Sequence, residues 1–375
     1  MKKVGLGLLL VIVVLVILLV INPTIRPSHV EPYQKLVAEQ TSPAPTESEI
    51  LQRVVLFGDA GHSSLEPWQA SMTRVAARAG ISPDKTVVVA LGDNIYMSGY
   101  PQKESGQESW DEGQLESISY LDAQLKVAEE SGATMFLVPG NHDWYASEVD
   151  SQAAHIAAFA RERAVATRFE PYEQGQPPLP ESEDFPGVSL VFLDSEWLLR
   201  ADDSQRDAAM AELDAQLARI RTAQADSLIV LTAHHPLETM GPHGGYLADF
   251  GYWLVMKILY AFTDAEDEDT NSSRYQLYIA AINEVVTKYD KVIFAAGHEH
   301  SLQVFRSSND QGPEYTLVSG AANTSKVSGV WHTDDTRFAL AQEGFLELAV
   351  TAQGVYLQVF DINHDQAVGA YWLAF

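Results

Sequence analysis

Short apolar runs of four or five residues, rich in aliphatic side chains, alternate with longer polar stretches along the chain. When a turn residue follows soon after, runs of this kind are typical of strands buried in a parallel sheet. We therefore predict that five such runs are parallel strands. They lie at residues 54–57, 87–91, 135–138, 228–231 and 292–296.

The rest of the pattern adds helices and further strands. Residues 115–130 and 274–289 have helical periodicity, and residues 188–193 form a sixth apolar strand. The alternation of residues 355–360 fits a strand with at least one packed face. We expect the last strands of the chain to close a second sheet; they are predicted at 315–319, 344–350, 355–361 and 368–373.

Each of the five apolar runs leads into a short motif of polar side chains. Because the carboxyl ends of parallel strands meet at one edge of a sheet, we expect these side chains to gather there. Carboxylate, imidazole, amide and phenol groups together are a set of nitrogen and oxygen ligands for metal ions. A single Gly-Asp after a strand is usually a turn or a helix cap, so the prediction rests on all five motifs. They read Gly58-Asp59-Ala60-Gly61, Gly92-Asp93-Asn94-Ile95-Tyr96, Gly140-Asn141-His142-Asp143, Ala233-His234-His235-Pro236 and Gly297-His298-Glu299-His300.

In this order the motifs resemble those of the calcineurin-like metallophosphoesterases, and most closely those of the purple acid phosphatases. Many members have Asp-x-His in the first motif, whereas Asp59 is followed here by Ala60-Gly61. Tyr96, three residues after Asp93, is similar to the tyrosinate ligand of purple acid phosphatases. Two alternatives stay open: that His62 is a ligand in an altered turn, and that Tyr96 is a tyrosine of the core or rim.

The resemblance implies an α/β fold of four layers, in which two mixed sheets are flanked by helices. It also implies two metal ions bridged by Asp93, one Fe(III) and the other a divalent iron, zinc or manganese ion. Anionic oxygen donors suit the trivalent ion, whereas neutral imidazole and amide donors suit the divalent one. The residues implied for the ferric site are Asp59, Tyr96 and His300. Those implied for the divalent site are Asn141, His234 and His298.

The same resemblance implies hydrolysis of a phosphomonoester by a metal-bound hydroxide. We expect His142 and His243 to face the substrate as electrostatic stabilisers or general acids. His235, next to a ligand on an extended segment, should point the other way and pack or hydrogen-bond behind the site. Asp194-Ser195-Glu196, after strand 188–193, is assigned no chemistry.

Two other functions are compatible with these motifs. A phosphodiesterase or pyrophosphohydrolase acting on nucleotide-linked or lipid-linked phosphate is the main alternative, because a fold does not fix its substrate. A non-catalytic binding module is disfavoured, because all the ligand types are present.

Composition favours one main enzymatic domain, predicted at residues 51–375. A chain of 375 residues with 46% hydrophobic content can bury a sizeable core. The chain has no cysteine, so this core must hold without disulfides. The formal net charge of −27 argues against a nucleic-acid partner, since such binding depends on Lys and Arg.

The N-terminal sequence predicts a membrane anchor at residues 1–21. Residues 4–21 are uninterrupted and apolar, and as a helix they would span roughly 27 Å, close to the thickness of a bilayer core. Lys2 and Lys3 favour a cytoplasmic N-terminus. We expect an inner-membrane signal anchor with the catalytic domain on the periplasmic side; a cleaved signal peptide is the alternative.

Two further segments bear on the membrane. Residues 22–50 are rich in Pro, Ser, Thr and Glu and predict a flexible stem. Residues 246–262 are rich in aromatic and aliphatic side chains and too short to span a bilayer. They predict either a buried core helix or an amphipathic lip that rests on lipid.

Overall fold

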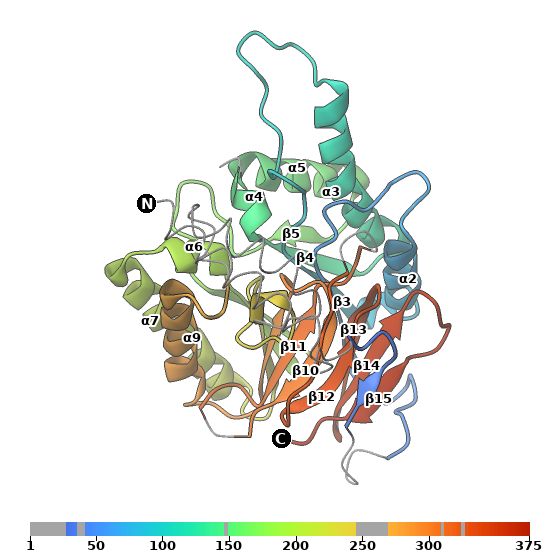
Figure 1. Ribbon diagram of the computed structural model, residues 1–375, viewed down its shortest axis with the longest axis vertical. Helices are drawn as coiled ribbons and strands as arrows, with labels where there is room; N and C mark the ends of the chain where they lie inside the picture. The colour runs from blue at the N-terminus through green and yellow to red at the C-terminus, as the bar shows by residue number, and fades with distance from the viewer. Residues whose placement is uncertain (1–27, 36–41, 146–148, 245–268, 309–310, 324–326) are drawn as a thin grey trace, which may run out of the picture.

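The computed structural model describes residues 28–35, 42–145, 149–244, 269–308, 311–323 and 327–375. They form two mixed sheets that pack face to face, with helices on the outer side of each (Figure 1). The predicted α/β architecture of two mixed sheets flanked by helices is confirmed.

One sheet has seven strands and carries the first three motifs. Its members β2 to β5 are parallel, and β13, β14 and β15 continue the sheet in antiparallel pairing from β2. In spatial order the strands are β15 (Gly369–Trp372), β14 (Gly354–Asp361), β13 (Gly344–Thr351), β2 (Ile50–Phe57), β3 (Thr86–Leu91), β4 (Thr134–Val138) and β5 (Thr167–Phe169).

The other sheet has eight strands and carries the last two motifs. Strands β7, β8, β9 and β11 are parallel, and the remaining neighbours pair antiparallel. In spatial order the strands are β1 (Tyr33–Gln34), β12 (Thr336–Leu340), β10 (Leu302–Arg306), β11 (Tyr315–Ser319), β9 (Val292–Ala296), β8 (Leu228–Thr232), β7 (Val188–Phe192) and β6 (Glu181–Phe185).

Alternation of side chains along each strand explains the layers. On β2, Val54 and Leu56 face the other sheet, whereas Val55 and Phe57 face the helices. Successive residues of a strand point to opposite faces, so a strand that is apolar throughout must be covered on both sides. The central parallel strands are therefore buried between the second sheet and a helical layer.

Among the described residues, helices cover each sheet on its outer side (Figure 1). The helices α3 and α7 both begin with a complete capping box, in which an Asp side chain and a Gln three residues later satisfy each other's backbone amides. On the seven-stranded sheet lie α2 (Ala70–Ala79), α3 (Glu112–Ser131) and α5 (Val149–Arg163). On the eight-stranded sheet lie α6 (Ser195–Arg200), α7 (Asp203–Ala223) and α9 (Ser273–Val286).

Two predictions about the sheets are wrong. The five motif strands do not share one sheet, because β2, β3 and β4 lie in the seven-stranded sheet and β8 and β9 in the eight-stranded one. The strands after residue 314 do not close a single sheet: β11 pairs with β9, whereas β13, β14 and β15 extend the sheet of β2. The apolar pattern locates each of these strands to within a residue or two, but it holds no information on which neighbour a strand selects.

Part of the predicted stem packs on the domain. Tyr33 and Gln34 form β1, which pairs with Ala339 and Phe338 of β12. The ring of His29 stacks on Trp331 at 4.5 Å between centroids. Aromatic side chains in this otherwise polar stretch thus give it apolar surface to bury.

Two of the predicted segments, residues 1–21 and 246–262, lie outside the described residues. Within the described ranges, we find no helix that combines the length and apolar character needed to cross a membrane.

Candidate metal centre

The five motifs come together where the carboxyl ends of the parallel strands of both sheets meet. Asp59, Asp93 and Asn141 follow β2, β3 and β4 of one sheet. His234 and the motif of residues 297–300 follow β8 and β9 of the other. Side chains that are up to 241 residues apart in the sequence, such as Asp59 and His300, thereby reach one buried place.

The backbone turns sharply at this edge. Asp59, Asp93 and His298 have positive φ angles of 60°, 53° and 65°. Non-glycine residues seldom adopt this left-handed conformation, and it occurs most often at functional sites. These turns follow directly on the ends of β2, β3 and β9.

Asp59, Tyr96 and His300 form one half of the centre. The Tyr96 hydroxyl donates to Asp59 Oδ1 at 3.0 Å and lies 3.1 Å from His300 Nε2, which is itself 3.2 Å from Asp59 Oδ1. Burial, followed by the charges of Asp59 and Asp93, raises the pKa of Tyr96 well above its ordinary value. The phenol therefore keeps its proton unless a cation binds beside it.

His234 and Asn141 form the other half. The Leu91 carbonyl lies 2.8 Å from His234 Nδ1 and can only accept, so this nitrogen carries a hydrogen. In the neutral ring, Nε2 then presents a lone pair to Asn141 Oδ1 at 3.0 Å and to Asp93 Oδ1 at 3.4 Å. Three acceptors that converge in a buried place fit a metal ion among them, or a proton on His234.

Asp93 connects the two halves. Its charge raises the pKa of Tyr96 on one side, and its Oδ1 faces His234 on the other. Burial opposes ionisation of Asp93, but the imidazoles of His234 and His142 and the backbone amide of His142 outweigh it, so the pKa lies below its ordinary value. The Asp93 carboxylate thus contacts both halves of the centre.

His298 contacts Asp59 and two of the other histidines. Its backbone N–H donates to Asp59 Oδ2 at 2.8 Å. Its ring centroid lies 5.1 Å from that of His234 and 4.1 Å from that of His243. The imidazole is thus placed between the predicted divalent site and a histidine predicted to face substrate.

The two predicted catalytic histidines are more exposed than most of the predicted ligands. The side chains of His142 and His243 are 15% and 27% exposed, whereas those of Asp59, Asp93 and His234 are at most 3% exposed. His142 donates from Nδ1 to the Met97 carbonyl at 2.6 Å. The Nδ1 atom of His243 lies 3.3 Å from Asp269 Oδ1. Each ring thus has one nitrogen held by a neighbouring group, and each is partly exposed to solvent.

His235 and His62 both lie near the centre, where His235 contacts Ser195 and His62 packs against Tyr96. His235 is fully buried, and its Nδ1 lies 2.9 Å from Ser195 Oγ. Burial, followed by the nearby His234, lowers the pKa of His235 well below its ordinary value. One of its ring nitrogens also lies within 4.8 Å of nitrogens of His234 and His298. His62 packs its ring 5.1 Å from that of Tyr96.

Two buried carboxylates that support the centre were not predicted. Glu299, between His298 and His300, accepts from the His243 backbone N–H at 3.0 Å and from Ser328 Oγ at 2.6 Å. Asp143 accepts from the Gly140 N–H at 2.8 Å. Burial and the charge of Asp93 raise the pKa of Asp143 to about 6. Each is an acidic residue inside a predicted ligand motif, and this position in the sequence was the signal that could have identified it.

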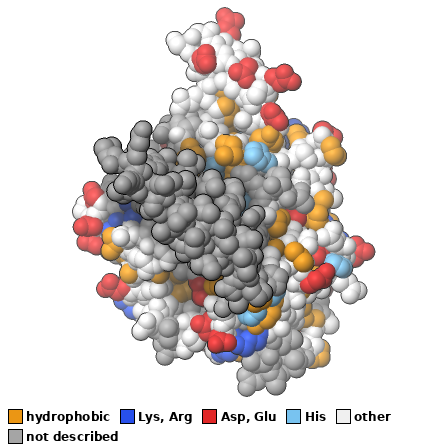
Figure 2. Space-filling model, viewed as in Figure 1, with side chains coloured by type: hydrophobic (Ala, Val, Ile, Leu, Met, Phe, Trp, Pro, Cys, Tyr) orange, Lys and Arg blue, Asp and Glu red, His pale blue; other side chains and the backbone are white. Residues whose placement is uncertain are grey.

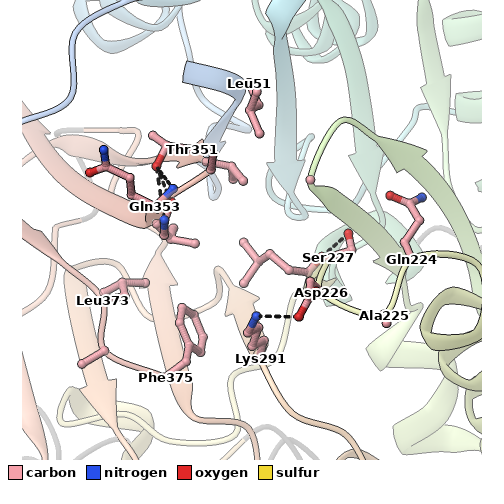
Figure 3. A pocket seen from close by; sticks show the side chains of 17 residues that line it. Leu51, Gln224, Ala225, Asp226, Ser227, Lys291, Thr351, Gln353, Leu373 and Phe375 are labelled. Atoms are coloured by element: carbon pink, nitrogen blue, oxygen red, sulfur yellow. Dashed lines mark hydrogen bonds and ion pairs between the residues drawn. The ribbon is translucent and has the colours of Figure 1, made fainter. Parts of the chain in front are cut away.

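A separate cavity of about 800 Å³ lies at the opposite edge of the sheets (Figure 3). Its lining includes Leu51, Leu228 and Lys291, at the start of β2, at the start of β8 and just before β9. The candidate ligands follow the carboxyl ends of these same strands. The cavity is therefore far from the converging ligands and is not the catalytic pocket.

Comparisons with known proteins agree with this geometry. The family model described as calcineurin-like phosphoesterase matches residues 52–302, about two thirds of the chain. The chain belongs to the calcineurin-like phosphoesterases. It is accordingly a metallophosphoesterase, a hydrolase with a buried His and Asp cluster suited to metal.

One similar solved structure is titled "GAP50 the anchor in the inner membrane complex of Plasmodium". The similarity has a TM-score of 0.53 at 14% sequence identity and covers 86% of this chain and 88% of that one. At this identity it is evidence of a shared fold alone. No curated protein matches the chain.

Gly140 allows a direct test of the metallophosphoesterase centre. A Cβ atom there would lie 2.3 Å from both the backbone nitrogen and Oδ1 of Asp93. We expect Gly140→Ala to displace Asp93 and weaken metal binding about 10- to 100-fold, as when groups that support ligands are changed. The measurement is a metal titration of the folded variant.

Gly113→Ala is the matched control. The nearest atom to a Cβ at Gly113, on α3, is Asp111 Oδ1 at 3.6 Å, an ordinary contact. Its metal affinity should equal that of the wild type. Unchanged affinity in a folded Gly140→Ala variant would exclude Asp93 from the centre.

Proposed function

We propose that this metallophosphoesterase hydrolyses phosphomonoesters as purple acid phosphatases do, with Fe(III) and a divalent iron, zinc or manganese ion. The observation that carries the proposal is the placement of the Tyr96 hydroxyl, 3.0 Å from Asp59 Oδ1 and 3.1 Å from His300 Nε2. A phenolate and a carboxylate are hard anionic donors, which favour a trivalent ion.

The chemistry of the two donor sets supports a mixed-valence pair. Fe(III) would be held by Asp59, Tyr96 and His300. The divalent ion would be held by Asn141, His234 and His298. Asp93 would bind both ions. Bound in this way, the two ions would activate water and polarise the phosphoryl oxygens.

The two exposed histidines can serve the rest of the reaction. His142 keeps one hydrogen on Nδ1, bound to the Met97 carbonyl. A second, transferable proton would then sit on Nε2, which lies 3.9 Å from Asp93 Oδ2. His243, next to Asp269, can place a second donor on the open side. Donors in these places stabilise the charge that develops on the phosphoryl and leaving-group oxygens.

The alternative function, hydrolysis of a lipid-linked or nucleotide-linked phosphodiester or pyrophosphate, has one observation in its favour. The apolar segment 246–262 is flanked by His243 and by Thr270, whose N–H donates to the His243 carbonyl at 3.1 Å. Both flanks thus lie at the centre. The composition of the segment between them, rich in aromatic and aliphatic residues, would suit a substrate with an apolar group.

A comparison of substrates decides between these functions. We expect the full-length chain, purified in detergent, to have a higher kcat/KM for phenyl phosphate than for diphenyl phosphate, because the monoester brings more negative charge to a cationic centre. Both esters are assayed on one metal-loaded preparation. A preference for the diester, or for a diester presented in lipid vesicles, would favour the alternative.

The colour of the protein tests the proposed ferric site. Tyrosinate bound to Fe(III) gives a broad visible charge-transfer band, so the wild type should be coloured and Tyr96→Phe colourless or much paler. Visible spectra and iron analysis of the same samples separate loss of the ligand from loss of the metal.

Tyr100→Phe is the control, because Tyr100 is also buried but its hydroxyl contacts His155 instead of the centre. Its band should be unchanged. A wild type that is colourless and free of iron, yet active with divalent metal, would refute the ferric site and leave the family assignment intact.

We further propose that residues 1–21 anchor the chain in the inner membrane, with the catalytic domain in the periplasm. The proposal rests on the uninterrupted apolar run of residues 4–21. Ser28, shortly after that run, accepts at Oγ from the Val330 N–H at 3.1 Å. In the same loop, the Ser328 N–H donates to the His300 carbonyl at 2.8 Å. The first described residues are thus close to the catalytic edge, which would face the bilayer.

Fractionation and protease protection test this placement. In spheroplasts of a bacterial host, we expect the full-length chain to sediment with membranes and its domain to be open to added protease. Release of the chain by high salt, or protection until the spheroplasts are lysed, would contradict the anchor or its orientation. A periplasmic and a cytoplasmic marker protein serve as controls.

A further inference from the structure

The backbone at His234 and His235 extends beyond the last hydrogen bond between β7 and β8. The last bond from β7 to β8 is donated by the Leu193 N–H to the Thr232 carbonyl at 2.9 Å. Immediately afterwards β7 turns into α6, whose N-cap is Asp194. The amides of His234 and His235 therefore have no strand to pair with on that side, although both residues are fully buried.

The hydroxyl of Ser195 takes the place of the missing strand. Ser195 Oγ accepts from the His234 N–H at 3.2 Å and from the His235 N–H at 2.9 Å. A serine oxygen has two lone pairs and one hydrogen, so these two bonds leave the hydrogen for a third partner. His235 Nδ1, at 2.9 Å, and the Tyr278 hydroxyl are the two partners available to it.

This single hydroxyl contacts both members of the histidine pair, whose ring centroids lie 5.0 Å apart. The His235 ring also has its Nε2 3.7 Å from Glu196 Oε2. The His234 ring is held separately, by the Leu91 carbonyl 2.8 Å from its Nδ1. Ser195 restrains the backbone of His234 and Leu91 restrains its ring.

We propose that Ser195 is a positioning residue for the metal centre, which acts by holding His234 in the geometry that presents Nε2 to the metal. The inference rests on the proposed role of His234 as a ligand. The backbone pairing of β7 with β8 is complete at Thr232, so these bonds contribute to the placement of the motif rather than to the sheet. Groups that orient a ligating histidine affect metal affinity strongly.

The test is a Zn²⁺ titration of full-length variants in detergent, by competition with a chelating dye. We expect Ser195→Ala to weaken Zn²⁺ binding about 10- to 100-fold, because two buried amides lose their acceptor. Ser195→Thr keeps a hydroxyl and should restore most of the affinity. Ser189→Ala, which removes a buried hydroxyl on β7 that bonds Asp184 of β6, should bind as the wild type does.

His234→Ala separates failure of this inference from failure of the proposed function. If His234→Ala binds Zn²⁺ normally, the proposed ligand set is wrong. The other comparison is of Zn²⁺ affinity in the two variants. The positioning role is refuted if a Zn²⁺-binding step is lost in His234→Ala but keeps its full affinity in folded Ser195→Ala. An equal loss in Ser189→Ala would also refute it, because any buried hydroxyl would then have the same effect.

Amide hydrogen exchange, measured on the wild-type protein, tests the proposal even if Ser195→Ala does not fold. If Ser195 binds both amides, those of His234 and His235 should exchange as slowly as the amides of β8, although they lie beyond its end. Exchange at the rate of an exposed loop would overturn the proposal without any variant.

Discussion

The site depends on the burial of two carboxylates at the ends of neighbouring parallel strands. Asp59 follows β2 and Asp93 follows β3, and oxygens of both lie within 4.8 Å of a nitrogen of His234. Two like charges in a buried place destabilise each other unless a cation is present. The imidazoles, amide and phenol around them are arranged to share such a cation. A metal ion is thus the simplest way to satisfy every donor that the fold brings to this edge.

The scaffold can hold this arrangement because the strands behind it are buried on both faces. Positive φ angles at Asp59, Asp93 and His298 are unfavourable locally and persist only where the surrounding structure fixes them. Close approach adds a second restriction, since the backbone at Gly140 leaves no room for a side chain beside Asp93. The rigid β-sandwich thereby stabilises turns that would otherwise relax and separate the ligands.

The sequence was sufficient to predict the central strands and to gather the motifs, because each apolar run and the polar residues after it are local features. It did not predict which sheet β11 joins, nor the helices α2, α5 and α7. It also gave no role to Ser195 or Glu299. Both contact residues that are distant in the sequence, namely His234 for Ser195, and His243 and Ser328 for Glu299. Such contacts depend on the tertiary structure, which a single sequence does not display.

Net charge is a poor guide to which substrates reach this centre. Acidic side chains gather on the projection formed by residues 97–111 and the start of α3 (Figures 1 and 2), where Glu104, Glu108, Asp111 and Glu112 are exposed. At physiological salt, exposed charges more than about 8 Å from a bound phosphate are largely screened. The open side of the centre instead presents the imidazoles of His142, His243 and His300. Local donors, rather than the overall charge of −27, therefore determine access for a phosphate ester.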